Sequence, residues 1–147
     1  MKAKQTLIAT GVIAFLAWLG MGPAVAAEGG QDAKPGAAEK KEVFKNVDVA
    51  QFEKLRADKA NVVLDVRTRK EFEAGHVPGA VHIDVNAADF EEKASKLDRH
   101  KTYLVHCAAG GRSVKACGKL GQIHFAKLYN LEGGFNAWQK AGNQPEK

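Results

Sequence analysis

The sequence has little cysteine and no grouping of cysteine with histidine. Cys107 and Cys117 are the two cysteines among 147 residues, too few for a framework of disulfide bonds. Neither they nor the five histidines fall in pairs with the spacing of a structural zinc site, so we expect no metal and no other cofactor. The chain must therefore rely on an ordinary hydrophobic core.

The chain also lacks a strong excess of one charge. It has 22 Lys+Arg and 17 Asp+Glu, a net charge of +5. Lys2 and Lys4 lie in a segment that we expect to be removed, which leaves 20 minus 17, or +3. Beyond Lys40 and Lys41, no basic run alternates with aromatic side chains, so we expect no nucleic-acid partner. With 45% hydrophobic and 27% charged residues, the composition is that of one globular domain.

The amino-terminal region has the three parts of a secretory signal peptide: lysines, an uncharged stretch and small residues. We predict a signal peptide over residues 1–26, cleaved after Ala26 or Ala27, and export, most simply to a periplasm. After cleavage we expect no stable membrane association. The alternative is an uncleaved membrane anchor, because the uncharged run over residues 5–27 reaches the ~20 residues that a membrane span needs.

A single folded domain is expected after this segment. Residues 27–42 are small and polar without apolar periodicity, which predicts a flexible linker. Residues 43–145, about 100 in number, are enough for one hydrophobic core. We expect this domain to be a monomer.

Short apolar runs predict strands, and helical patterns lie between them. The expected strands are 43–47, 61–66, 80–83, 101–106 and 126–131. Two helices are expected to begin at Asp48 and Thr68, and a third follows Asn86 over 87–97. A fourth, within 112–124, has Val114, Cys117 and Leu120 on one apolar stripe. A fifth, near the end of the chain, has Phe135, Trp138 and Ala141 on one stripe. This alternation predicts an α/β three-layer sandwich, with a mostly parallel five-stranded sheet and helices on both faces. Ligands of such sheets bind at the carboxyl ends of the strands.

The segment after the strand at 101–106 has the composition of an anion-binding loop. It reads Cys107, Ala108, Ala109, Gly110, Gly111, Arg112, Ser113. Small residues and glycines at the start of a helix predict a ring of backbone N–H groups around the sulfur. These amides, the helix dipole and the Arg112 guanidinium should favour thiolate over thiol. Ser113 is expected to cap the helix. We predict that Cys107 is a nucleophile near neutral pH.

This loop and two further stretches resemble the rhodanese family. The loop fits the pattern C-x-x-G-x-R-S, Leu64 to Ala80 is similar to the first signature of the family, and Asn130 to Gly142 is similar to the closing one. The three motifs occur in the family's order. The resemblance covers about residues 43 to 143 and implies a rhodanese-like fold.

The resemblance also implies a sulfurtransferase. Cys107 would take the outer sulfur of a donor such as thiosulfate, a small sulfur-containing anion, and release sulfite. A thiol or cyanide-like acceptor would then remove the sulfur from the Cys107 persulfide. The implied substrate-binding residues are Ala108, Ala109, Gly110, Gly111, Arg112 and Ser113, with Arg112 orienting the sulfonate end of the donor. Ala108 and Ala109 are apolar where some thiosulfate-using members carry polar or basic residues, which disfavours thiosulfate as the donor.

Three other functions stay open. The domain could be a persulfide carrier that passes sulfur to a partner protein, or a scaffold without catalysis. A small phosphatase is the third alternative, because His106-Cys107 superficially matches related phosphatases. Those enzymes have five residues between cysteine and arginine, whereas four separate Cys107 from Arg112. The smaller loop suits one sulfur atom better than a phosphoryl group.

Four residues near the expected loop need separate interpretation. Asp65 and Arg67 end a neighbouring strand, where they either support the loop by hydrogen bonds or form a structural ion pair with Glu71 or another surface acid. His106 precedes Cys107 on a strand and should point away from the pocket, because side chains alternate between faces. Cys117 is expected in the core rather than in a disulfide bond.

Overall fold

A computed structural model describes residues 42–147. The predicted signal peptide over 1–26 and the linker as far as residue 41 lie outside the described residues. Within the described part, no helix has the length and apolar character needed to cross a bilayer.

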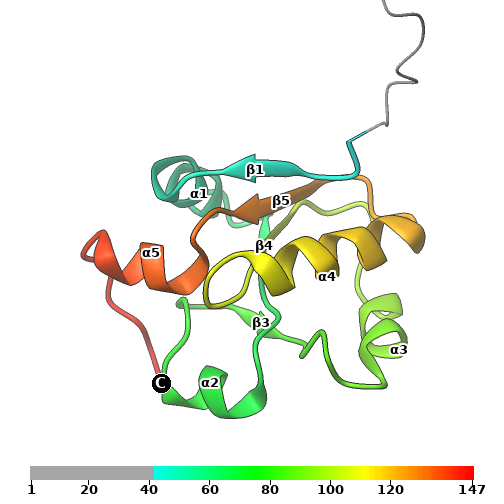
Figure 1. The fold of residues 1–147 in the computed structure, drawn as a ribbon. Coiled ribbons are helices and arrows are strands. Elements are labelled where there is room, and N and C mark those ends of the chain that lie inside the picture. The colour runs from blue at the N-terminus through cyan, green and yellow to red at the C-terminus, as the bar shows by residue number, and fades with distance from the viewer. Residues whose placement is uncertain (1–41) are drawn as a thin grey trace, which may run out of the picture. The chain divides into compact units, whose positions relative to one another are not determined.

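Strands and helices alternate along the chain (Figure 1). They are β1 (Lys45–Val47), α1 (Val49–Arg56), β2 (Val62–Asp65), α2 (Arg69–Ala74), β3 (Val81–His82), α3 (Phe90–Ser95), β4 (Tyr103–His106), α4 (Gly111–Gln122), β5 (Leu128–Leu131) and α5 (Gly134–Lys140). The strand order is β1-β5-β4-β2-β3, and every neighbouring pair is parallel. The predicted fold class is therefore confirmed, with β4 in the centre of the sheet.

Apolar side chains from alternate strand positions fill a separate core on each face of the sheet. The first core packs against α3 and α4 and includes Leu64, Phe90, Val105, Cys117 and Leu120. The second packs against α1 and α5 and includes Phe52, Leu104, Leu131, Phe135 and Trp138. Each helix thus buries one stripe against the sheet, as amphipathic helices do.

Several predicted details were wrong. The helix expected to follow Asn86 begins only at Phe90, because residues 85–89 form turns. Phe90 and Ala94 nevertheless occupy the core. Val114 was placed on the buried stripe of α4, but it is 42% exposed. The buried stripe instead runs through Ala116, Cys117 and Leu120. Ala141 is likewise exposed, since α5 ends at Lys140.

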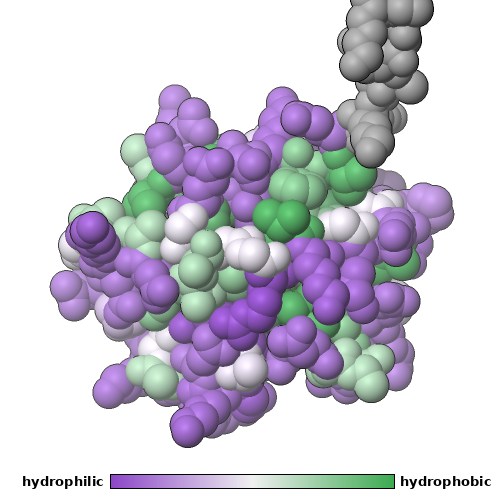
Figure 2. Space-filling model, viewed as in Figure 1, coloured by the Kyte–Doolittle hydropathy of each residue, from purple (hydrophilic) through white to green (hydrophobic). Residues whose placement is uncertain are grey.

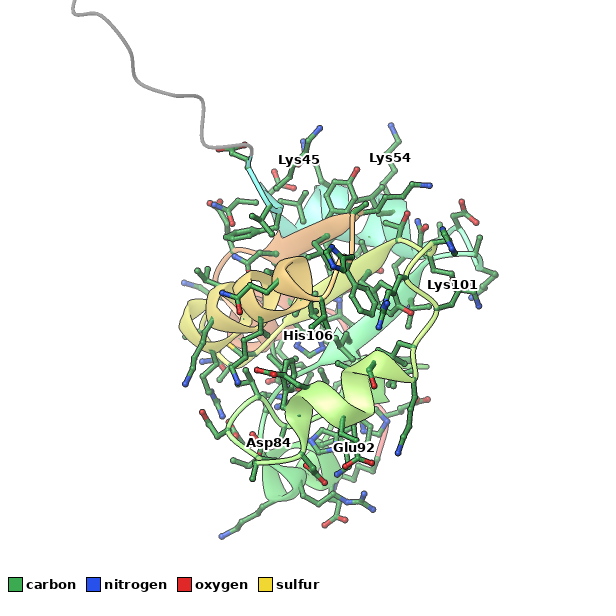
Figure 3. The ribbon with its side chains drawn as sticks, turned by 90° about the vertical axis from the view of Figure 1, so that its right-hand side faces the viewer. Lys45, Lys54, Asp84, Glu92, Lys101 and His106 are labelled. Carbon is green, nitrogen blue, oxygen red and sulfur yellow. The ribbon has the colours of Figure 1, made fainter. Side chains whose placement is uncertain are left out.

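The alternation of side chains along β4 separates His106 from Cys107. Val105 and Cys107 belong to the core beneath α4, whereas Leu104 lies in the core beneath α1 and α5. His106 is fully buried and contacts the rings of Phe52 and Phe135 on that second side. It lies in the interior of the molecule (Figure 3), directed away from the cysteine loop as expected.

The outer surface is mainly hydrophilic. Figure 2 shows one face on which polar side chains dominate and apolar ones are scattered. Val43, Val81 and Val114 are the large apolar side chains exposed in the described range. Scattered exposed apolar residues of this kind are normal for a globular domain.

Candidate functional site

Cys107 lies at the carboxyl end of the central strand. It follows β4 directly, and α4 begins four residues later at Gly111. Gly110 has φ of +105°, a conformation that side-chain-bearing residues rarely adopt. This conformation turns the chain tightly enough for the loop to bend back over the sulfur.

Loop groups donate hydrogen bonds to the sulfur. The Gly110 N–H lies 3.1 Å from Cys107 Sγ, and the Ser113 hydroxyl lies 3.5 Å from it. Burial alone would raise the pKa of the Cys107 thiol. Hydrogen bonds from the Ser113 hydroxyl and from the loop amides outweigh burial and hold that pKa below its usual value. The loop therefore stabilises a thiolate.

Ser113 was expected to cap α4, but its side chain does not cap the helix. The capping position is Gly110, and it provides no side-chain cap. The Ser113 hydroxyl instead lies 2.8 Å from the Gly110 carbonyl oxygen and within reach of Sγ. A hydroxyl has one proton, so donating it to a thiolate weakens the bond to Gly110. The hydroxyl can follow the charge state of the sulfur.

The start of α5 fixes the backbone of the cysteine loop. The Phe135 N–H donates to the Cys107 carbonyl oxygen at 2.7 Å, and the Asn136 N–H donates to the Ala108 carbonyl oxygen at 3.0 Å. With these carbonyls held by α5, the amides of the following loop residues are free to face the sulfur. Gly134 permits this close approach, because a Cβ there would lie 2.5 Å from the Cys107 oxygen.

Arg112 is bound by Glu71. Arg112 Nη1 and Nη2 donate to the two carboxylate oxygens at 2.7 Å each. Glu71 Oε2 also accepts from the Thr68 backbone N–H and hydroxyl, which completes a capping box at the start of α2. The predicted role of Arg112 in orienting a donor must therefore compete with a bidentate ion pair.

The pKa values of the two groups show how strongly each stabilises the charge of the other. Hydrogen bonds from Arg112 lower the pKa of Glu71 to about 2, against the opposing effect of partial burial. Hydrogen bonding to Glu71 in turn raises the pKa of Arg112. The pair stays ionised near neutral pH, and its net charge of zero weakens the attraction of the loop for an external anion.

Asp65 and Arg67 form a buried ion pair with each other. Arg67 Nη2 lies 2.6 Å from Asp65 Oδ2, and its Nε also contacts the carboxylate. Nη2 further donates to the Gly75 carbonyl oxygen at 2.8 Å. Among the described residues, neither side chain bonds to the loop 107–113, and Glu71 is not their partner. The alternative of a structural ion pair is thus confirmed in kind, but Asp65 and Arg67 pair with each other rather than with Glu71 or a surface acid.

An indirect route does connect Arg67 with the loop. Its guanidinium carbon lies 4.1 Å from the centre of the Phe135 ring, a favourable cation–π distance. The backbone N–H of that same phenylalanine holds the Cys107 carbonyl. The Asp65–Arg67 ion pair can therefore help to fix the position of Phe135, which binds the loop.

Cys107 itself is 1% exposed. A sulfur donor therefore reaches Cys107 Sγ only when the loop 107–113 moves. Ala109 and Gly111 are the exposed members of the loop, while Ser113 is fully buried. Both exposed residues are small, so little side-chain volume stands in the way of a donor.

Cys117 has a different environment. It is fully buried in the core beneath α4, and burial raises the pKa of its thiol to about 12. Both cysteines are free, as expected. Residues 42–147 contain no cluster of three metal-ligating side chains.

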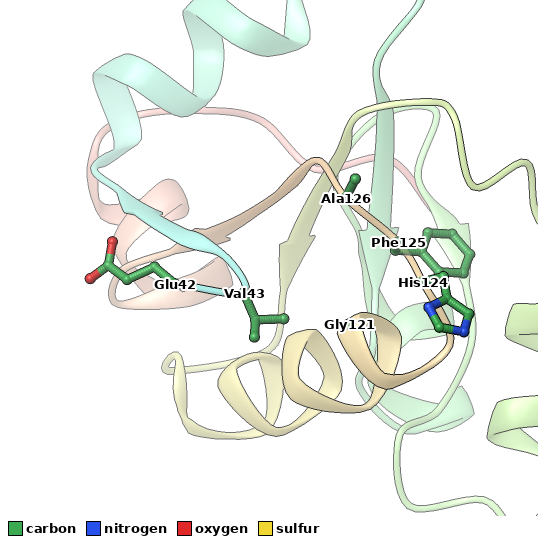
Figure 4. A pocket seen from close by; sticks show the side chains of 6 residues that line it. All are labelled: Glu42, Val43, Gly121, His124, Phe125 and Ala126. Atoms are coloured by element: carbon green, nitrogen blue, oxygen red, sulfur yellow. The ribbon is translucent and has the colours of Figure 1, made fainter. Parts of the chain in front are cut away.

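The cavity in Figure 4 is not part of this site. It has a volume of about 360 Å³ and lies between the start of β1 and the end of α4. It is lined by Glu42, Val43, Gly121, His124, Phe125 and Ala126. Because all strands are parallel, this cavity lies at their amino ends, whereas Cys107 follows a carboxyl end.

Sequence reasoning missed two contributors to the site. Glu71 was predicted to start a helix with Thr68 or to form an ion pair with Arg67, whereas its carboxylate binds Arg112. The closing motif from Asn130 to Gly142 was recognised without a role, yet the amides of Phe135 and Asn136 hold the loop. The adjacent glycines Gly133 and Gly134 were a usable sequence signal for this close contact, because glycine readily adopts positive φ. In the structure both have positive φ, and two chain segments meet closely there.

Comparison with known proteins gives consistent matches. The sequence profile of the family described as rhodanese-like domain matches residues 48–141. The protein YtwF of Bacillus subtilis is 40% identical over 87 residues, which are 59% of this chain and 82% of that protein. The thiosulfate sulfurtransferase GlpE of Pseudomonas fluorescens is 38% identical over 97 residues, which are 65% of this chain and 85% of that protein.

Solved structures agree with these sequence matches. The crystal structure of a rhodanese-related protein from Thermoplasma volcanium has a TM-score of 0.62 at 30% identity, covering 69% of this chain and 97% of that one. A protein from Staphylococcus saprophyticus has a TM-score of 0.60 at 28% identity, covering 70% of this chain and 99% of that one.

Proposed function

Because the chain belongs to the family of rhodanese-like domains, we propose that it is a sulfurtransferase that carries a sulfane sulfur on Cys107. The hydrogen bonds to Cys107 Sγ are the observation that carries this proposal. They lower the pKa of a thiol that burial alone would leave protonated, and only the thiolate is an effective nucleophile.

In the first step, the Cys107 thiolate attacks the outer sulfur of a donor such as thiosulfate. The new bond joins the two sulfurs of a persulfide, and the sulfur–sulfur bond of thiosulfate breaks. Sulfite leaves with the electron pair of that bond. The terminal sulfur of the persulfide is anionic, so the Gly110 N–H and the Ser113 hydroxyl are donors suited to stabilise it.

In the second step, an acceptor thiolate attacks the terminal sulfur. A bond forms between the acceptor and that sulfur, and the bond to Sγ breaks. The electron pair returns to Cys107, which is again a thiolate. No cofactor or net oxidation is needed, since the sulfane sulfur only changes its partner.

Sulfur loading tests the proposal. The intact mass of the protein is measured after incubation with thiosulfate, polysulfide or a low-molecular-weight persulfide, and thiocyanate is measured after addition of cyanide. We expect a gain of one sulfur atom that Cys107→Ser abolishes and Cys117→Ser preserves. Absence of sulfur uptake from every donor would overturn the proposal and favour a scaffold.

A persulfide carrier is the second candidate. The bidentate pairing of Arg112 with Glu71 leaves little net charge to attract a small dianion, and Cys107 is 1% exposed. Both observations favour slow turnover on small donors and transfer to a partner protein. Stoichiometric loading with slow thiocyanate formation would support the carrier, whereas rapid multiple turnovers would support the enzyme.

We also propose that the domain acts after export. The proposal rests on the lysines, the uncharged stretch and the small residues of segment 1–27. Mass spectrometry of the mature protein from cell fractions tests it. A periplasmic protein that begins at Ala27 or Glu28 is expected, and a membrane-bound chain that retains residues 1–26 would support the anchor instead.

A further inference from the structure

A cavity of about 310 Å³ is lined by residues of α2, of α5 and of the carboxyl-terminal segment. Arg67, Glu71, Gly75, Phe135, Gln139 and Pro145 contribute to its lining. Two contacts connect it to the loop. Glu71 binds Arg112, and Asn136, which also lines the cavity, donates its N–H to the Ala108 carbonyl.

Arg67 brings a buried cation to the wall of this cavity. The residue is 4% exposed, and its Nε and Nη2 are occupied by Asp65 and the Gly75 carbonyl oxygen. Because the guanidinium is a rigid planar fork, Nη1 projects on the side away from Asp65. Within residues 42–147, no acceptor bonds to Nη1. Among these residues, the fully buried side-chain atoms that lack a hydrogen-bond partner are His106 Nε2 and Asn130 Oδ1. Nη1 also lacks a partner but is not one of these atoms, so it is not fully buried. We therefore infer that Nη1 faces the cavity that Arg67 lines.

The unused donors of Nη1 suit an anionic oxygen. A carboxylate oxygen is a strong acceptor for a guanidinium N–H, because both groups are charged. The carboxylates nearby do not oppose such a ligand strongly, because Asp65 is neutralised by Arg67 and Glu71 by Arg112. The exposed Gln139 adds a polar side chain without charge.

We propose that this cavity binds the sulfur acceptor, and that the preferred acceptor is a thiol that carries a carboxylate. This inference rests on the proposed sulfur transfer and specifies its second step. The carboxylate binds Arg67 while the acceptor thiolate attacks the terminal sulfur on Cys107. The bond from acceptor sulfur to terminal sulfur forms as the bond to Sγ breaks, and the electron pair returns to Cys107.

A matched pair of acceptors provides the test. Persulfide-loaded protein is mixed with 3-mercaptopropionate or with its amide, and kcat/KM is measured for each. Replacing Arg67 would break the buried ion pair, so the charge of the cavity is changed at Gln139 instead. We expect Gln139→Glu to lower the ratio of kcat/KM for the carboxylate acceptor to kcat/KM for the amide about fivefold. Gln139→Lys should raise this ratio by a similar factor. The intrinsic reactivities of the two thiols cancel in this comparison.

Gln51→Glu and Gln51→Lys are the controls, since Gln51 is an exposed glutamine on α1, and they should leave the ratio unchanged. Sulfur transfer with an equal ratio in wild type and both Gln139 variants would overturn the acceptor site while leaving the proposed function intact. A wild-type protein that acquires no sulfur would overturn both, and the loading step reveals which has failed.

Discussion

Glu71 binds both terminal nitrogens of Arg112 at 2.7 Å, across 41 residues of sequence. The contact joins the first turn of α2 to the first turn of α4. It also places a carboxylate beside a loop that we propose to be anion-binding. The glutamate therefore sets how much of the Arg112 charge remains for a donor.

Glu71→Gln is expected to lower the KM for thiosulfate several-fold. The variant removes a negative charge, while a glutamine can still accept from the Thr68 N–H in the capping box. The freed guanidinium charge should also make KM more sensitive to salt. Steady-state kinetics at two ionic strengths measure both effects.

Glu73→Gln is the control for this experiment, because Glu73 forms an exposed ion pair with Arg69 on the same helix. Its KM should stay that of the wild type. An unchanged or raised KM in Glu71→Gln would show that the glutamate positions the arginine rather than competing with the donor.

Ser113→Ala is expected to raise the pKa of the Cys107 thiol and to slow sulfur uptake at neutral pH. The variant removes the hydroxyl that lies 3.5 Å from Sγ and helps to lower this pKa. The pH dependence of alkylation by iodoacetamide measures the change. Ser95→Ala is the matched control, since Ser95 makes the same kind of bond to a carbonyl three residues earlier. An unaltered titration curve in Ser113→Ala would assign the thiolate to the amides alone.

Gly134→Ala is expected to destabilise the domain by about 2 kcal/mol or more and to impair loading of Cys107. Gly134 has φ of +57°, and the added Cβ would lie 2.5 Å from the Cys107 carbonyl oxygen. Gly142→Ala separates the two causes, because Gly142 also has a positive φ of +91° but nothing within 4 Å. Chemical denaturation and intact mass provide the readouts. Normal loading of a stably folded Gly134→Ala protein would contradict the positioning role of α5.

His106 should make the domain sensitive to mild acid. Burial lowers the pKa of His106 to about 4, although Asp65 partly opposes the shift. The folded state thus holds this histidine neutral, whereas the unfolded chain gains a proton near pH 6.5. His106 therefore does not reduce the free energy of unfolding above pH 6.5. As the pH falls towards 4, the free energy of unfolding decreases by up to about 3 kcal/mol, because the unfolded chain binds the proton more readily.

Urea denaturation between pH 4 and 8 measures this dependence. His106→Asn removes the titrating group, so its stability curve should be flatter than that of the wild type over this range. His100→Asn, the same change at an exposed histidine, should keep the wild-type slope. Parallel curves for wild type and His106→Asn would exclude His106 as the source.

The overall fold could be predicted because strand and helix patterns are local. The runs 61–66 and 101–106 contain several apolar and β-branched residues, and the alternation of strands with helices favours a parallel sheet. Boundaries were less predictable. The stretch after Asn86 has apolar residues at helical spacing. The N–H groups of Asn86 and Ala87 nevertheless donate to Asp84, and turns over residues 85–89 delay the helix to Phe90. Val114 fits the apolar spacing of α4 but lies beside the buried stripe, where no neighbouring element covers it.

The cysteine and its amide loop were predictable for a similar reason. Strand, small residues, glycines and helix are contiguous from 103 to 122, so one segment defines the surroundings of the sulfur. The partners of the charged residues were not predictable, because they depend on long-range packing. Arg112 binds Glu71 on another helix. Arg67 binds Asp65, only two residues away, because long-range packing buries both side chains together. Sequence alone offers several acids within reach of each arginine.

The all-parallel sheet also has a practical consequence. Lys45 begins β1 at the amino ends of the parallel strands, whereas Cys107 follows the central strand β4 at their carboxyl ends. Anything attached ahead of Lys45 therefore joins the domain on the side remote from the reactive thiol. Biotinylated at its amino-terminal side and immobilised on a sensor chip, the protein should present Cys107 to the flowing solution.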